Sequence, residues 1–167
     1  MRLLDEKFKT HRTRYVLQCS LAACVVCIVL LILNTISDTA IIAALGASSF
    51  IAFTMPRVDA SQPRFLIGGY LIGTTVGCLC HHLVPLSCFI QLPFDPEHSQ
   101  AILGAVSVGL AMFLMVITDT EHPPAAGLAL AFVLNEWDYF TVIVVLVGIV
   151  SISTLKSLLK PLLLNLL

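Results

Sequence analysis

Residues 118–132 read TDTEHPPAAGLALAF, so that two acids and a histidine stand directly before a double proline and an apolar run. Pro123 and Pro124 have a φ angle fixed near the helical value and no N–H group. They therefore fit the first positions of a helix and are costly in its interior. The stretch predicts that a new helix begins at Pro123 and continues to Leu134.

The start of this helix is a candidate ligand site. Because prolines carry no N–H group, the first free backbone amides would be those of Ala125, Ala126 and Gly127. These amides would point back towards His122, with the positive end of the helix dipole behind them. A helix end of this kind favours an anion.

The composition of the chain indicates an integral membrane protein. Apolar residues make up 58% of the 167 residues and charged residues 11%, which lies outside the range of ordinary soluble domains. This length allows one bundle of about six spans of roughly 20 residues each. We predict an all-α transmembrane fold, with a basic tail at residues 1–15 and a single membrane domain at 16–167. Membrane lipid is an expected partner and nucleic acid is not.

Apolar segments alternate with polar turns along the chain. The expected helices cover residues 16–34, 39–55, 65–84, 100–117, 123–134 and 140–159. Two of these, 39–55 and 123–134, are shorter than a typical membrane core. Small residues at 46–49 interrupt the first short segment, and they predict either close helix packing or an unwound kink that lines a cavity.

The positions of lysine and arginine favour six crossings. With six crossings, the basic residues of the tail lie on the same side of the membrane as Arg57, Arg64, Lys156 and Lys160. Two re-entrant hairpins would instead leave Arg57 and Arg64 outside. By the positive-inside rule we expect both termini in the cytoplasm. Loops this short fit a bacterial inner membrane.

Small residues predict how the helices pack. Gly69, Gly73 and Gly77 recur one turn apart, which lets two helix backbones approach each other closely. This row must pack on something within or between chains, so we expect a homo-oligomer. The six cysteines lie mostly in apolar runs and are interpreted as core residues. No metal site and no cofactor are expected.

The chain shows signs of an internal repeat. A shift of 79 residues places residues 48–53 over 127–132 and matches the order of long and short apolar segments. Repeat 1 would cover about 16–84 and repeat 2 about 100–160, and three crossings in each half would make the repeats inverted. Secondary transporters build mid-membrane sites from such repeats with interrupted helices. The alternative is a duplicated packing unit without a transport path.

The predicted depth of the polar stretch makes its ionisable residues candidates for function. A helix from Pro123 to Leu134 covers only roughly 18 Å, so with Trp137 at the outer interface His122 would lie inside the hydrocarbon. Asp119 and Glu121 would lie there as well. Ionisable groups at such depth normally serve function, here proton or cation coupling. Alternatively, a tilted helix would let all three reach cytoplasmic water.

Four short motifs in combination resemble the HPP family of integral membrane proteins, and the resemblance runs from the first span to the last. They are His122-Pro123-Pro124, Gly46-Ala47-Ser48, Gln62-Pro63-Arg64 and Ile67-Gly68-Gly69. Members in chloroplasts and cyanobacteria are described as nitrite transporters, so the resemblance implies a small-anion transporter. Some relatives have a small residue where Glu121 stands and a histidine where Tyr70 stands. The acids of this chain equally suit a cation path.

Two functions from different classes follow from these patterns. The first is a transporter or channel for a small ion, bound by the amides of residues 125–127 together with Ser48 and Ser49. Arg64 would attract an anion at the cytoplasmic mouth, and His122 would orient the ligand or carry a proton. The second is a non-transporting structural or sensory module that oligomerises through its glycine-rich faces. An enzyme is not expected, because no nucleophile or metal set has usable spacing.

Overall fold

The computed structural model describes residues 12–21, 23–24, 27, 39–89, 96–163 and 165–166. Throughout these residues the regular structure is helical, which confirms the all-α prediction. Residues 12–21 form an N-terminal helical segment. The elements that follow are α2 (Thr39–Thr54), η1 (Asp59–Ser61), α3 (Pro63–Phe89), α4 (Pro96–Thr118), α5 (Pro123–Leu134) and α6 (Tyr139–Leu159).

The double proline starts a helix as predicted, since α5 runs from Pro123 to Leu134. The alternative of an unwound kink at residues 46–49 is wrong, because α2 is continuous through them. Helix α3 is longer than expected. It begins at Pro63, where a proline fits the first turn, and continues past Pro85 to Phe89. The expected first span, 16–34, lies mostly outside the described residues.

Three of the described helices are long and apolar enough to cross a membrane: Pro63–Pro85, His98–Thr118 and Tyr139–Leu159. Helices α2 and α5 are apolar but shorter. At 16 and 12 residues they cover roughly 24 and 18 Å. The structure thus combines long spans with two short helices, whereas the inverted relation between the two halves stays a prediction.

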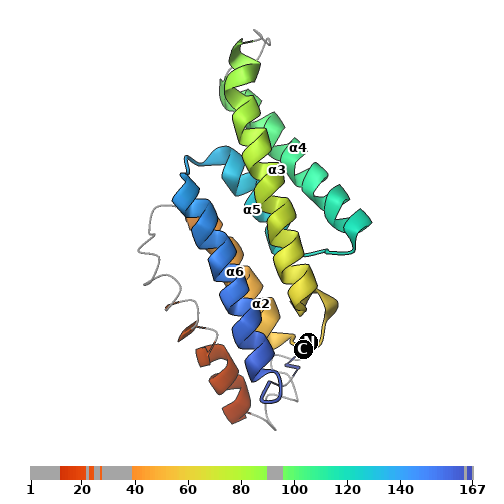
Figure 1. Ribbon diagram of the computed structural model, residues 1–167. Helices are drawn as coiled ribbons and strands as arrows, with labels where there is room; N and C mark the ends of the chain where they lie inside the picture. Colours follow the sequence, from red (N-terminus) through yellow and green to blue (C-terminus); the bar gives the residue numbers. More distant parts are fainter. Residues whose placement is uncertain are drawn as a thin grey trace, which may run out of the picture.

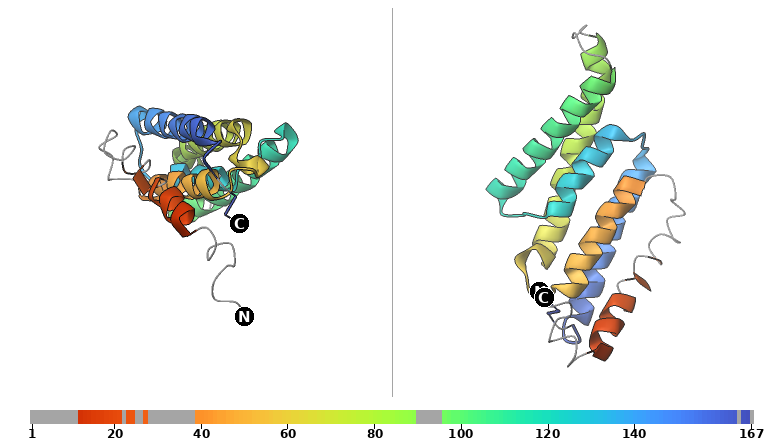
Figure 2. Two further views of the ribbon diagram at one scale, coloured as in Figure 1. Left: turned by 90° about the horizontal axis from the view of Figure 1, so that it is seen from below. Right: turned by 180° about the vertical axis from the view of Figure 1, so that it is seen from behind.

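Helices α3 and α5 form the middle of the bundle (Figure 1). Helix α4 lies on one side of them, and α2 and α6 lie on the other (Figure 2). Consecutive helices run in opposite directions, which places loop 55–62 and the end of α6 at the same end of the molecule. The amide of Leu166 donates to the carbonyl of Thr54 over 2.9 Å and ties the C-terminal residues to that end.

The glycine row of α3 lies directly against α5. A Cβ atom added at Gly77 would stand 2.8 Å from the carbonyl oxygen of Ala129, and one added at Gly73 would meet the carbonyl of Ala125. Only glycine allows the two backbones to approach this closely. The packing holds the start of α5 beside α3, well inside the bundle.

The cysteines divide between the core and the surface. Cys80 on α3 is buried, as expected, but Cys19, Cys24 and Cys27 are exposed. The interpretation as core residues is therefore wrong for these three. They lie near the start of the chain among other exposed apolar side chains, so this face suits contact with lipid or with another helix.

Helix α6 has a well-formed N-cap at Asp138. One carboxylate oxygen accepts hydrogen bonds from the backbone amide and from the hydroxyl of Thr141, each over 2.8 Å. These bonds favour the ionised carboxylate, so they hold the pKa of Asp138 below its usual value.

We expect Asp138→Ala to lower the melting temperature most at neutral pH. Because the folded-state pKa is depressed, the cap contributes fully above the unfolded value of about 4 and is lost as the pH falls through the folded value. The difference between wild type and variant should therefore shrink below about pH 4. This difference in melting temperature is measured in detergent from the fluorescence of the single tryptophan, Trp137. A difference in melting temperature that does not change with pH would contradict the assignment of the Asp138 carboxylate as the N-cap of α6.

Candidate functional site

The polar linker between α4 and α5 begins with a tight helix end. Asp119 has a left-handed φ of 54°. The amide of Thr120 donates to the carbonyl of Met115 over 3.0 Å, and that of Asp119 donates to Val116 over 3.3 Å. This pair of bonds is the Schellman motif, which satisfies the last carbonyls of a helix. The motif turns the chain back towards α3.

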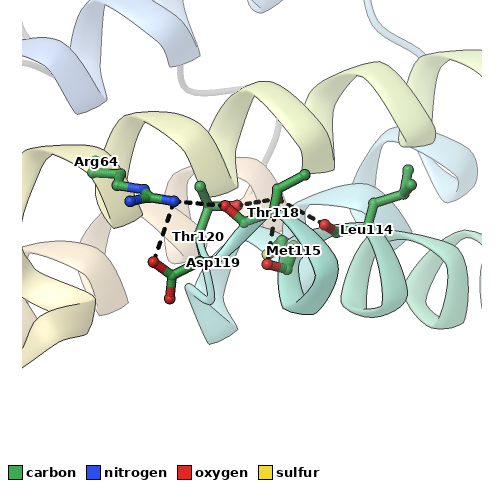
Figure 3. A network of polar contacts seen from close by, with 6 residues as sticks. All are labelled: Arg64, Leu114, Met115, Thr118, Asp119 and Thr120. Carbon is green, nitrogen blue, oxygen red and sulfur yellow. Dashed lines mark hydrogen bonds and ion pairs between the residues drawn. The ribbon is translucent and has the colours of Figure 1, made fainter.

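The exposed side chain of Arg64 contacts this end of α4. Its guanidinium donates to the carbonyl of Thr118 over 3.0 Å and lies 3.2 Å from the carboxylate of Asp119 (Figure 3). The two charged side chains are 61% and 66% exposed. A carboxylate and a helix C-terminus therefore compensate the charge of Arg64, whereas its expected role in attracting an anion stays a prediction.

His122 is the centre of a buried hydrogen-bond network. Its side chain is only 1% exposed. The Nε2 atom lies 2.8 Å from Ser48 Oγ, and the Nδ1 atom lies 3.0 Å from the carbonyl oxygen of Ala60. Ser48 Oγ in turn lies 2.8 Å from the Tyr70 hydroxyl and 2.9 Å from the carbonyl of Ala44. The network joins the linker to α2, α3 and η1.

The proton count of this network distinguishes two states of His122. A carbonyl can only accept, so Nδ1 must carry a proton towards Ala60. The contacts number four, while Ser48, Tyr70 and a neutral imidazole supply only three protons. With a neutral ring, Ser48 donates to Nε2 and its contact with Ala44 has no proton. An imidazolium supplies the fourth proton and completes every contact.

The three ionisable residues of the linker are separated from one another. His122 is buried, but Asp119 and Glu121 are exposed on the protein surface. The depth of the three residues in the membrane stays a prediction, but only His122 is enclosed by protein. The reason is the extended backbone of His122, which turns its side chain towards α2 while its neighbours face outwards.

A cavity of about 280 Å³ lies next to His122. It is lined by Glu121, His122, Pro123 and Ala126, and by three apolar side chains of α4, Met112, Met115 and Val116. Glu121 and the edge of the buried network therefore border one mostly apolar space, whose volume could hold several water molecules or a small ion.

The amides at the start of α5 are less available than expected. Pro123 and Pro124 have no N–H group, and the amide of Ala125 donates to the carbonyl of His122 over 2.9 Å. The expectation of a free amide at Ala125 is therefore wrong, because the first turn closes on itself. Gly127 is exposed, and nothing lies within 4 Å of the position of its missing Cβ atom. The positive end of the helix dipole remains next to His122.

Ser49 differs from its neighbour Ser48. Both are buried, at 2% and 0% exposed, but among the described residues the hydroxyl of Ser49 has no hydrogen-bond partner. The buried hydroxyl of Thr74 on α3 likewise has no hydrogen-bond partner among the described residues. Within the same part of the chain, no group of three or more His, Cys, Asp or Glu residues could hold a metal ion.

The network also contains two groups that the sequence did not assign to the site. Tyr70 offered one signal, a phenol hydroxyl within the apolar run Phe65–Gly73. The carbonyl of Ala60 offered none, because a backbone acceptor has no sequence signature. Sequence patterns proposed His122 and Ser48 for one site, and the structure brings these two into contact.

Comparison with known proteins gives a match over nearly the whole chain. The family described as "HPP, transmembrane region" matches residues 8–163. Two proteins of Dictyostelium discoideum, both named as transmembrane proteins, are 28% and 27% identical over 113 and 120 residues. These matches cover 65% and 70% of this chain, but only 36% of each relative's length. No solved structure matches it.

Proposed function

This chain belongs to the HPP transmembrane family, and from that premise we propose that it is a transporter or channel for a small inorganic ion. The observation that carries the proposal is the buried network of His122, Ser48 and Tyr70 beside a cavity that also exposes Glu121. Buried ionisable groups in a membrane domain are expensive and normally lie on an ion or proton path.

The proposed cargo is a small anion such as nitrite. An imidazolium at His122 and the positive end of the α5 dipole would both attract an anion to the cavity. With the amide of Ala125 occupied, these charges rather than backbone donors would hold it. Glu121 on the same cavity wall opposes an anion when it is ionised, and it would favour a bound proton or cation instead.

Protonation of His122 would couple proton movement to the ion. The groups that contact its ring nitrogens are the hydroxyl of Ser48 and the carbonyl of Ala60, and the centroid of the Tyr70 ring lies 5.7 Å from that of His122. None of them is charged at neutral pH, and the nearby carboxylate of Asp119 is already paired with Arg64. Loss of the proton reverses the hydrogen bond between Ser48 and His122 Nε2, so that Ser48 donates to the ring and its bond to Ala44 within α2 is lost.

The position of His122 along the bundle suits such a path. A Cβ atom added at Gly69 would stand 2.6 Å from the Cβ atom of His122. Gly69 lies six residues into α3, so the histidine is roughly 9 Å from the start of that helix at Pro63. In the proposed orientation His122 would lie below the cytoplasmic surface of the membrane.

Ion flux tests the proposal. Proteoliposomes containing the full chain should take up nitrite, nitrate or formate faster than empty liposomes, and an inward proton gradient should accelerate the uptake. We expect His122→Gln to lower the rate at least tenfold, because glutamine cannot carry the proton. The matched control is His82→Gln, which changes an exposed histidine at the other end of α3. Equal rates for His122→Gln and wild type would reject the role of His122.

A non-transporting module is the second candidate, and the tight start of α5 favours it. The first turn offers no amide from its prolines or from Ala125, and His122 is almost completely enclosed. In that case folded protein in liposomes would pass none of the three anions and no protons at any pH. A melting curve that is unchanged after reconstitution would show that the protein is still folded, and that the absence of flux is not caused by unfolding.

A further inference from the structure

We propose that the end of the molecule at which α6 stops binds an anionic phospholipid, with the lipid phosphate held between Arg57 and Lys160. A cavity of about 520 Å³ opens there. It is lined by Pro56, Arg57, Ser157, Lys160, Pro161 and Leu163. Arg57 belongs to the loop after α2, so the fold brings together two cations that are far apart in the sequence.

The charges around this cavity are positive and lack acidic partners. Within the described part of the chain, neither Arg57 nor Lys160 forms an ion pair. Asp59, the acid closest to Arg57 in sequence, accepts a hydrogen bond from Gln62 over 2.8 Å. Lys156 lies one turn before Lys160, but it is only 3% exposed and does not line the cavity.

An anion between these cations would relieve their mutual repulsion. The negative end of the α6 dipole accounts for lysines in the last turn of that helix, but it does not account for an arginine from another loop. The hydroxyl of Ser157 already donates to the carbonyl of Ser153 over 2.8 Å. Binding of an anion would therefore depend mainly on Arg57 and Lys160.

A second, apolar cavity indicates that the anion belongs to a lipid. This cavity of about 720 Å³ lies between the N-terminal helical segment and the end of α6. Its apolar lining includes Val16, Leu17, Leu21, Leu159, Leu162 and Leu163. Leu163 lines both cavities, so the apolar space adjoins the basic one.

One amphiphile fits both spaces, with its phosphate in the basic cavity and an acyl chain along the leucines. Free phosphate would occupy only the first cavity. Basic pockets near the ends of membrane helices are suited to anionic headgroups, and the apolar groove supplies the contact that a soluble anion would not use. The proposal therefore specifies an anionic phospholipid as the occupant.

Native mass spectrometry of the full chain in a neutral detergent tests this site. With matched dioleoyl lipids, phosphatidylglycerol should be retained about tenfold more than phosphatidylcholine. Arg57→Gln and Lys160→Gln should each remove most of this preference, and Lys160→Arg should keep it. The control is Arg64→Gln, which also removes one positive charge, but from a group paired with Asp119.

The outcomes separate a lipid from other ligands. Equal retention of the two lipids, or an equal loss of preference in Arg64→Gln, would overturn the proposal. Displacement of phosphatidylglycerol by millimolar inorganic phosphate would indicate a site for a free anion and would overturn it too. Melting curves confirm that the variants are folded. Lipid retention is independent of ion flux, so its result stands whether or not the protein transports an ion.

Discussion

Replacing Gly73 by alanine is expected to lower the free energy of unfolding by about 3 kcal/mol or more. The added Cβ atom would collide with the backbone carbonyl of Ala125 on α5. A flexible side chain could move aside, but a carbonyl inside a helix cannot move without shifting the whole of α5. Such a shift would also displace His122, so ion flux should fall together with stability.

Gly127→Ala is the matched control for this substitution. It adds the same methyl group to α5, but at an exposed position with nothing within 4 Å. Because alanine favours a helix over glycine, stability should rise by about 0.5–1 kcal/mol. Both changes are measured by unfolding in detergent with Trp137 fluorescence, a probe that contacts Phe132 of α5. If Gly73→Ala were as stable as Gly127→Ala, direct contact between the two backbones would be disproved.

Ser48→Ala is expected to lower the free energy of unfolding by about 2–3 kcal/mol and to abolish proton-coupled uptake. The serine hydroxyl connects Tyr70 and His122, both of which are buried. Without it, the Tyr70 hydroxyl and His122 Nε2 each lose a partner, and an unsatisfied buried polar group costs about 1–3 kcal/mol. Tyr70→Phe removes a single contact and should have about half the effect on stability.

The adjacent serine provides a sharp control. Ser49→Ala removes the same hydroxyl from the same helix at nearly the same burial, but this hydroxyl has no hydrogen-bond partner in the described part of the chain. We therefore expect stability to stay constant or to rise by up to about 1 kcal/mol. Equal losses in the two alanine variants would show that burial, and not the network, determines the effect.

The local sequence alone was sufficient to predict where α5, the helix next to His122, begins. Pro123 and Pro124 restrict φ and exclude a helix interior, so the start of α5 could be predicted to the residue. The end of α3 could not, because the expected helix stopped at residue 84, before Pro85, whereas α3 continues to Phe89. A proline inside a membrane helix is tolerated when neighbouring groups satisfy the freed carbonyl.

The side-chain directions in the linker could not be predicted. Sequence patterns grouped Asp119, Glu121 and His122, but in the structure only His122 points inwards. Arg64 shows the same limit. Sequence patterns suggested a charge that attracts an anion, and only the fold shows that Arg64 lies at the C-terminus of α4 and is paired with Asp119.

By itself, the sequence determined the membrane class, the all-α fold and the glycine row, since these depend on composition and on spacing along one helix, and its short motifs carried the resemblance to the family. Only the tertiary structure decided which groups join this network: the Ser48 hydroxyl from α2 and the Ala60 carbonyl from η1 contact the His122 ring, and the Tyr70 hydroxyl from α3 contacts Ser48. The physical reason is distance along the chain. Helical periodicity fixes which residues share a face over a few turns, but pairing between faces depends on how closely whole helices pack, and here the glycines of α3 permit that contact.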